Sequence, residues 1–502
     1  MSLKRNIITN YASQIYVTLT GICMVPLYIS FMGAEAYGLV GFFAMLQAWF
    51  ALLDMGLTPT MARETARFNG GAMDAMSYRR LVRALEGVFL LVAVVGGVGL
   101  FLLSESIAHD WLKAKALSVV EIQQCLQMMS FIIAMRWMAG LYRGAISGAE
   151  RLVWLGNYNA LVATMRFVLV LPLLIFVSAA PATFFGFQLA IALVELVGLL
   201  IFAYQLLPKL PNGQRIQWEW APLKPLLKFS LTISFTASVW VLVTQTDKLV
   251  LSKILPLADY GYFTLAVLLA SGIMIVSGPI SSAIMPRMTR LEAESKHAEM
   301  IVVYRQATQL VTVLAMPVAL VLALFSKQVL WAWTGDAELV EKAAPVLSLY
   351  ACGYVILAIS AFPYYLQYAK GDLKLHLIGN LFFVGLLIPT LIWTTINFEM
   401  IGAGWAWLTA NLIYFLLWVP LVHHRFAPGL HWPWLTRDVF FTGMPAIIFA
   451  YLAKYYTSWP VDRMAVITHL FILGLLLLVI TSLSSQKVRI LLSNHFDMIK
   501  MA

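Results

Sequence analysis

The chain consists of a series of apolar segments, each about 20 residues long, separated by short polar turns. This feature limits the fold most, because about 20 apolar residues in an α-helix cross the hydrocarbon core of a bilayer. Hydrophobic residues make up 61% of the 502 residues and charged residues only 12%, with a mean hydropathy of +0.83. Nothing else in the chain could bury so many apolar segments, so the sequence predicts a polytopic membrane protein.

The apolar segments predict an all-α protein with about fourteen transmembrane helices. Helices are favoured over a barrel because barrel strands need only about ten alternating residues, and because a helix satisfies its own backbone hydrogen bonds in lipid. The expected spans are 7–32, 36–57, 81–103, 120–146, 153–178, 183–206, 227–253, 260–284, 301–325, 344–368, 374–396, 401–421, 438–456 and 464–483.

The distribution of lysine and arginine predicts the orientation. With both termini in the cytoplasm, the cytoplasmic segments hold about 24 of the 34 basic residues and the opposite side about 7, as the positive-inside bias requires. A net charge of +10 could also indicate a nucleic-acid partner, but the basic residues are spread over alternating segments and form no basic tract. The expected cytoplasmic segments are 1–6, 58–80, 147–152, 207–226, 285–300, 369–373, 422–437 and 484–502.

The chain contains an internal repeat. Tyr37-Gly38 and Tyr260-Gly261 are 223 residues apart (260 − 37 = 223), and the same offset relates SGAERLVWLGN to KGDLKLHLIGN, taking Gly148 to Gly371. The offset covers six spans, an even number, so both copies enter the membrane the same way round. This predicts a parallel repeat, with a pseudo-two-fold axis along the membrane normal and a cavity between the two copies.

The repeat predicts the domain organisation. Two six-helix lobes are joined by a proline-rich cytoplasmic linker and followed by helices 13 and 14 and a cytoplasmic tail. The longest loops have about 20 residues, which is too short for a soluble catalytic domain, so we expect no enzyme. The expected boundaries are 1–207, 208–225, 226–422, 437–484 and 485–502.

Several other classes of protein are disfavoured. Cys23, Cys125 and Cys352 lie inside apolar segments and indicate neither a disulfide framework nor a metal site. The sequence has no GxxxxGK[ST] loop for ATP hydrolysis and no nucleophile motif. Ala34-Glu35-Ala36 looks like a signal-peptidase site, but the preceding segment is rich in polar residues and its repeat counterpart is internal. We therefore expect the first segment to be a permanent span.

Charged residues inside the spans are the candidates for function, because an intramembrane charge usually faces a cavity or a partner. Arg136 and Arg166 fall in the middle of spans 4 and 5, Glu195 in span 6, and Asp247 and Lys248 in span 7. One interpretation is a cationic cavity for an anionic substrate. The alternative is internal pairing of Glu195 with Arg166 or Arg136, and of Asp247 with Lys248 or another neighbour. Two central arginines against one central acid favour the anion site.

Other polar residues have less specific interpretations. Asp54 closes span 2 at the expected cytoplasmic rim, where capping or pairing with Arg63 or Arg67 is favoured over transport chemistry. Arg143 is expected to be a topology determinant first, with a second interpretation as part of a rim that meets phosphate. Three polar residues on spans 1 and 7 either line the cavity or form interhelical hydrogen bonds, namely Asn10, Gln14 and Gln245.

The stretch FMGAEAYGLVGFFAMLQAWFALLDMGLTPTMARETAR at 31–67, with TDKLVLSKILPLADYGYFTLA at 246–266, resembles the Wzx family of polysaccharide repeat-unit flippases. That family belongs to the multidrug/oligosaccharidyl-lipid/polysaccharide exporter superfamily. The resemblance covers essentially the whole chain. It implies a bacterial inner-membrane protein that moves an undecaprenyl-diphosphate-linked O-antigen or capsule unit from the cytoplasmic to the periplasmic leaflet. Alternating access of the lobes, coupled to an H⁺ or Na⁺ gradient, is the implied mechanism, with no other cofactor.

Burial and charge, rather than a family motif, select the residues for these roles. Arg136, Arg166 and Lys248 are the candidates for contact with the diphosphate, and Glu195 and Asp247 for ion or proton coupling. By resemblance to lipid II flippases, spans 13 and 14 are expected to flank a groove for the polyprenyl tail. Membrane lipid and the polysaccharide polymerase machinery are the further partners that the resemblance suggests.

Other functions stay open at this point. A drug/cation antiporter of the same superfamily shares the twelve-helix core, but its substrate calls for unpaired acids in the cavity. A polysaccharide polymerase should have a large periplasmic loop, and a membrane glycosyltransferase an acidic outer-loop motif and a soluble domain. A scaffold without transport would leave the intramembrane charges without a purpose.

Overall fold

The computed structural model describes residues 3–209, 217–486 and 489, and these residues are almost entirely helical. Within them, the only β-type pairing is an isolated bridge between Lys113 and Pro256. The chain separates into two compact units, Met1–Gly261 and Tyr262–Ala502. The predicted all-α fold is confirmed.

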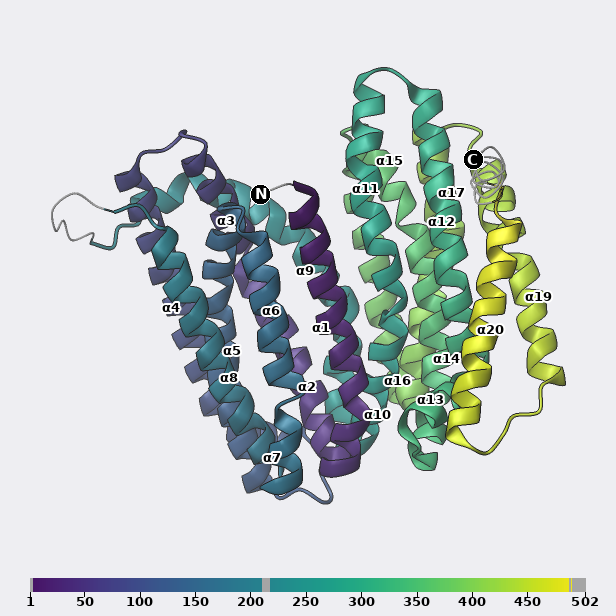
Figure 1. Cartoon of the computed structure of the whole chain (residues 1–502), viewed down its shortest axis with the longest axis horizontal. Coiled ribbons are helices and arrows are strands. Elements are labelled where there is room, and N and C mark those ends of the chain that lie inside the picture. Colours follow the sequence, from purple (N-terminus) through teal and green to yellow (C-terminus); the bar gives the residue numbers. More distant parts are fainter. Residues whose placement is uncertain (1–2, 210–216, 487–488, 490–502) are drawn as a thin grey trace, which may run out of the picture. The chain divides into compact units, whose positions relative to one another are not determined.

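In the first unit the long helices run side by side (Figure 1). Helix α5 packs against α4 and α8, and α1 packs against α6. The helical elements of this unit are α1 (Leu3–Met32), α2 (Ala34–Phe50), η1 (Ala51–Asp54), α3 (Leu57–Asn69), α4 (Ala75–Ser106), η2 (Ile107–Trp111), α5 (Val119–Gly148), α6 (Leu152–Phe167), α7 (Val170–Phe176), α8 (Pro181–Leu206), η3 (Ala221–Leu223), α9 (Lys224–Ile254) and the start of α10 (Leu257–Ser271).

In the second unit α12 is central, because it contacts α11, α14, α19 and α20. The elements that follow α10 are α11 (Ile273–Ala293), α12 (His297–Leu324), α13 (Ser326–Thr334), α14 (Ala337–Ser360), α15 (Phe362–Ala369), α16 (Lys374–Ile413), η4 (Tyr414–Trp418), α17 (Val419–Phe426), α18 (His431–Pro433), η5 (Trp434–Phe440), α19 (Phe441–Tyr456) and α20 (Arg463–Ser484).

The helices agree with the predicted spans. By length and hydropathy, 12 helical segments of the described chain could cross a membrane. One of them, 374–426, contains two predicted spans, because Glu399 breaks the helical geometry of α16 (φ 50°, ψ −134°). A Cβ at Gly402 would collide with the Thr394 carbonyl. In a straight helix these two residues, eight positions apart, would be separated by about 12 Å along the axis. The chain therefore reverses there. Helix α9, with 31 residues, corresponds to predicted span 7.

The two Tyr-Gly landmarks of the repeat lie against each other. A Cβ at Gly261 would lie 2.8 Å from the carbonyl oxygen of Ala34, and a Cβ at Gly38 would collide with the carbonyl of Leu257. Ala34 and Leu257 are themselves related by the repeat offset (257 − 34 = 223). Gly38 thus meets Leu257, and Gly261 meets Ala34, the repeat equivalent of Leu257. A local two-fold relationship requires such reciprocal contacts.

The connection between η2 and α5 is fixed by two sets of contacts. The Glu35 carboxylate accepts hydrogen bonds from the backbone N–H groups of Lys115, Ala116 and Leu117, at 2.7, 2.8 and 3.0 Å. The backbone carbonyl of Lys113 accepts a hydrogen bond from the N–H of Leu257 at 2.7 Å, and the Lys113 Nζ donates one to the Ile254 carbonyl at 3.0 Å. This loop therefore holds the start of α2 and the α9–α10 junction together.

The last two helices are anchored to α12 by a buried polar network. Asp438, in η5, accepts hydrogen bonds from Arg305 Nε at 2.6 Å and from Gln309 Nε2 at 2.7 Å. Ser485, after α20, donates to Gln309 Oε1 at 3.0 Å. Asp438 is fully buried, so its removal would leave the partly buried Arg305 without its ionic partner.

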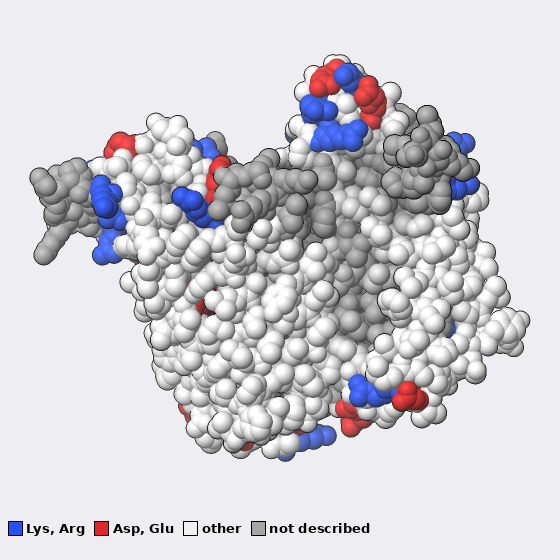
Figure 2. All heavy atoms as spheres, in the orientation of Figure 1, with Lys and Arg blue, Asp and Glu red and all other residues white. Residues whose placement is uncertain are grey.

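On the face that Figure 2 shows, charged side chains gather at the helix ends, and the surface between the ends is nearly free of them. This is the pattern expected of helices surrounded by lipid. Residues 210–216 of the expected linker and all but three residues of the expected tail lie outside the described part of the chain. The lobe boundaries derived from the repeat stay a prediction.

Candidate functional site

Four charged side chains of the first unit, three arginines and a glutamate, meet where α5, α6 and α8 pack together. Arg136 and Arg143 on α5 are seven residues apart, as are Gln188 and Glu195 on α8. Seven residues make nearly two helical turns, so each pair lies on one face of its helix, about 10 Å apart along the axis. Arg136 contacts Gln188 and Arg143 contacts Glu195. The two helices therefore run parallel and form two polar layers.

Glu195 is the acidic centre of the cluster. Its side chain is only 2% exposed and pairs with two arginines, Arg143 of α5 and Arg166 of α6. Arg166 Nη2 lies 2.6 Å from Glu195 Oε2, and Arg143 Nη2 pairs with Oε1. Both carboxylate oxygens are thus occupied by guanidinium groups, which satisfies a charge that would otherwise be costly to bury.

The second layer connects Arg136 to the same cluster. Arg136 Nη2 donates to Gln188 Oε1 at 3.1 Å, and Gln188 Nε2 donates to the Arg166 backbone carbonyl at 3.0 Å. The Arg136 guanidinium also lies over the ring of Phe43, 5.2 Å from its centroid, at a distance typical of a cation–π contact. A continuous chain of hydrogen bonds therefore joins Arg136, Gln188, Arg166, Glu195 and Arg143.

A helix break next to Arg166 supplies the carbonyl that Gln188 uses. Helix α6 ends at Phe167 and α7 begins at Val170, with Pro172 in its first turn. Proline has no N–H and its ring clashes with the carbonyl four residues earlier, which favours a break in the helix at this point. The carbonyl groups freed before the break accept from Gln188 and from the Tyr28 hydroxyl, the latter at 2.6 Å from Phe167.

The cluster has an excess of positive charge and of hydrogen-bond donors. Three arginines face one glutamate, which leaves two positive charges (3 − 1 = 2). The Nε atoms of all three arginines are buried and find no acceptor in the described part of the protein. Buried donors normally have partners, so three unsatisfied donors within one cluster are unusual. The same described residues contain no group of three His, Cys, Asp or Glu side chains suited to a metal ion.

The other predicted cavity residues lie on α9 and α1. Lys248 Nζ is 3.7 Å from Asp247 Oδ1 and donates to the Thr244 carbonyl at 2.5 Å, so these two residues form their own ion pair on α9. Gln245, on the same helix, is half-buried, and Gln14 on α1 is exposed. The side chain of Asn10 lies outside the described part of the structure.

The predicted rim residues separate into two groups. Asp54 accepts hydrogen bonds from the backbone N–H and hydroxyl of Thr58, at 3.2 and 2.6 Å, and so caps α3. Arg63 pairs with Glu64 at 3.2 Å. Arg143, by contrast, is turned toward Glu195 and belongs with the central arginines. Its expected role as a topology determinant stays a prediction.

Sequence reasoning overlooked Arg143 as a partner of Glu195, and Gln188 altogether. Both could have been found from spacing, because each lies seven residues from a residue that was selected, Arg136 in one case and Glu195 in the other. The pairing of Glu195 with Arg166 was one of the alternatives that the sequence left open, and the structure contains it.

Comparisons with known proteins agree with this architecture. The profile of a family described as polysaccharide biosynthesis protein matches residues 3–292, and that of the MatE family matches residues 233–393. No curated protein matches the sequence significantly. Among solved structures, the lipid II flippase MurJ in an inward closed conformation has a TM-score of 0.73 at 13% identity, covering 95% of this chain and 98% of MurJ.

Multidrug transporters also share the fold. The MATE multidrug transporter DinF-BH has a TM-score of 0.59 at 16% identity, with 88% of this chain and 97% of that chain covered. An inward-facing MATE transporter of the MOP superfamily has a TM-score of 0.60 at 15% identity, covering 84% and 95%. The TM-scores and coverages establish a common fold, which agrees with the resemblance to the exporter superfamily seen in the sequence. Because the first family profile spans more than half of the 502 residues, the chain belongs to the polysaccharide biosynthesis protein family.

Proposed function

We propose that this protein is a flippase that moves a polyprenyl-diphosphate-linked oligosaccharide, such as an O-antigen or capsule repeat unit, across the bacterial inner membrane. The undecaprenyl carrier, the cytoplasmic-to-periplasmic direction and coupling to an H⁺ or Na⁺ gradient are part of the proposal. Alternating access of two helical lobes is the mechanism, and the polysaccharide polymerase machinery is the partner that receives the product.

The arginine cluster carries the proposal. A diphosphate has several anionic oxygens, and arginine binds such groups through paired, charge-assisted N–H donors. Arg136, Arg143 and Arg166 present an excess of two positive charges and three buried Nε donors without acceptors in the described protein. Away from bulk water such charge complementarity is much stronger than at a surface. Glu195 would hold the arginines in place when no substrate is bound, and on its protonation would release them.

An apolar groove supports a lipid-linked substrate. It has a volume of about 450 Å³, lies between α12 and α20, and is lined only by apolar side chains and one glycine. Such a surface suits an isoprenoid chain, which offers no hydrogen bonds. The lining residues are Leu314, Pro317, Val318, Val321, Leu322, Leu470, Phe471, Gly474, Leu475 and Leu478.

Deletion of the gene in its host, followed by complementation, tests the proposal. Without the protein, complete lipid-linked oligosaccharide should accumulate on the cytoplasmic leaflet and surface polymer should be lost. Arg136→Ala and Arg166→Ala should each restore transport poorly at normal membrane levels. Arg83→Ala is the matched control, since Arg83 pairs with Glu86 at 3.2 Å in the same unit but is 58% exposed. Full transport by both cluster variants would refute the anion site.

A second pair of variants tests the groove. Gly474 lines it, and a Cβ at this position would meet no atom within 4 Å, so Gly474→Leu should fill the groove without disturbing the helix packing. Gly99 of α4 has equally open surroundings and provides the control Gly99→Leu. Transport should fall in the first variant alone. Equal transport by both would remove the groove from the proposal.

The match to the MatE family favours an ion-coupled drug/cation antiporter as the second candidate. A cationic substrate would be repelled by the positive excess of the cluster, so we rank this function lower. An unchanged surface polysaccharide together with altered drug tolerance in the deletion strain would reverse the ranking. Single repeat units that reach the surface unpolymerised would instead indicate a polymerase.

A further inference from the structure

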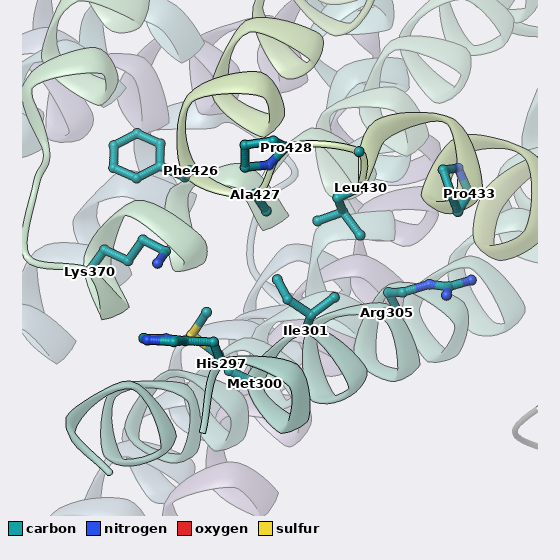
Figure 3. Close-up of a pocket in the computed structure, with 11 residues that line it drawn as sticks. His297, Met300, Ile301, Arg305, Lys370, Phe426, Ala427, Pro428, Leu430 and Pro433 are labelled. Carbon is teal, nitrogen blue, oxygen red and sulfur yellow. The ribbon is translucent and has the colours of Figure 1, made fainter. Parts of the chain in front are cut away.

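A separate pocket lies at one end of the second unit, where three connections meet (Figure 3). Its walls come from the start of α12, from Lys370 after α15, and from the segment between α17 and η5. Its volume is about 380 Å³. The positive-inside pattern predicts all three connections to be cytoplasmic, which would put the pocket at the level of the cytoplasmic headgroups.

The pocket presents basic side chains while their acidic partners lie outside its lining. Lys370 and His297 line it, and both contact Glu292, at 3.2 and 2.8 Å. Arg305 lines it and is held by Asp438, which is fully buried. Neither acid contributes to the wall. Burial raises the pKa of Glu292, but the hydrogen bonds from His297 and Lys370 outweigh this and lower it, so the carboxylate stays ionised.

The rest of the wall is apolar. Met300 and Ile301 come from α12, and Phe426, Leu430 and Pro433 from the opposite side of the pocket, as Figure 3 shows. Helix α12 begins at His297 without a side-chain cap, so the partial positive charge of a helix N-terminus adds to the basic side chains at this wall. A cationic end next to an apolar wall fits an amphiphile with an anionic head better than a fully polar anion.

We propose that this pocket binds the phosphate headgroup of an anionic phospholipid from the surrounding membrane. Lys370 and His297, which lie together because both contact Glu292, contact the phosphate, and the apolar wall contacts the glycerol backbone and the first methylene groups. The site is distinct from the apolar groove along the same helix, because the pocket's last residue on α12, Arg305, and the groove's first, Leu314, are nine residues or about 13 Å apart along the helix axis. It therefore does not depend on the proposed transport activity.

Native mass spectrometry of the purified full-length protein tests this site. Phosphatidylglycerol is the probe, phosphatidylethanolamine the zwitterionic comparison and inorganic phosphate the soluble one. The first phosphatidylglycerol should bind more tightly than phosphatidylethanolamine, and Lys370→Gln should weaken it about tenfold, the effect of one charge-assisted hydrogen bond. Lys327→Gln is the matched control, since Lys327 pairs with Glu341 at 3.1 Å, and it should leave the affinity unchanged.

Two further measurements separate binding from folding. Lys370→Arg keeps the charge and should bind phosphatidylglycerol within about threefold of the original protein, whereas a purely structural lysine would show no such rescue. Phe426→Ala, in the apolar wall, should weaken the binding of phosphatidylglycerol but should not change the binding of inorganic phosphate. Unchanged phosphatidylglycerol binding by Lys370→Gln would overturn the proposal. So would competition by inorganic phosphate at equal concentration, because it would assign the site to soluble anions.

Discussion

Replacing Glu195 by glutamine tests the arginine cluster most directly. Glutamine has nearly the same volume, so no cavity is created, and the change removes the charge and replaces one acceptor oxygen by an NH₂ donor that faces an arginine. Glu195 is 2% exposed and is the acid that neutralises Arg143 and Arg166. Removing one partner from a buried ion pair costs about 3–5 kcal/mol. The side chains of Arg143 and Arg166 are 36% and 20% exposed, and this partial hydration lowers our estimate to about 2–4 kcal/mol.

The loss is measured as the decrease in the free energy of unfolding of Glu195→Gln relative to the original protein, by SDS titration in mixed micelles. Glu338→Gln is the control, because Glu338 pairs with Lys342 at 2.9 Å and is 67% exposed, so its loss should cost less than about 0.5 kcal/mol. In the double variant Glu195→Gln/Arg143→Gln, part of the cost should be recovered, with a coupling of about 1–3 kcal/mol. A loss below about 1 kcal/mol for Glu195→Gln would show that Glu195 does not hold the cluster together. So would a loss in the double variant equal to the sum of the losses in the two single variants.

Three other predictions concern the packing of the units. Gly261→Ala should destabilise the protein by about 1–3 kcal/mol in the same titration, because its Cβ would meet the Ala34 carbonyl. Gly99→Ala, whose Cβ would lie in open space, should be neutral or stabilising. Equal effects of the two substitutions would contradict the close contact at Gly261. Glu35→Gln should raise the rate of amide hydrogen exchange at residues 115–117, because their N–H groups donate hydrogen bonds to the Glu35 carboxylate. Unchanged protection from exchange would show that these hydrogen bonds do not hold the loop. Asp438→Asn should increase proteolysis of α19 and α20, and resistance equal to that of the original chain would mean that other contacts anchor them.

The fold was largely predictable because the bilayer imposes a length and a composition on each helix. All fourteen expected spans correspond to helical segments, and even the close pair in α16 was separated at the right place, next to Glu399. The constant offset between Tyr37-Gly38 and Tyr260-Gly261 also had a structural meaning, since these glycines pack together. Hydropathy and repetition are properties of the chain itself, so they can be read without knowing which helices are neighbours.

The candidate site was predictable only in part, because pairing depends on which helices are in contact. Burial and charge selected Arg136, Arg166 and Glu195, but nothing in one sequence says that α5 packs against α8 in parallel. Arg143 was therefore interpreted from its position near a span end, although its guanidinium reaches Glu195. The pocket around Lys370 was beyond sequence reasoning, since it joins segments more than 120 residues apart (428 − 305 = 123).

The repeat also provides an internal comparison that separates the needs of the fold from those of function. If the fold required the charge cluster, the second copy should carry charges at the equivalent positions. At the offset of 223, the four charged residues of the cluster, Arg136, Arg143, Arg166 and Glu195, correspond to Ile359, Leu366, Pro389 and Trp418, none of which is charged. The same helical arrangement is therefore compatible with uncharged residues at these positions. Buried ion pairs are costly and often replaceable by apolar side chains without loss of stability. Charges in one copy alone are what the proposed anion site predicts, because a purely structural role would not confine them to that copy.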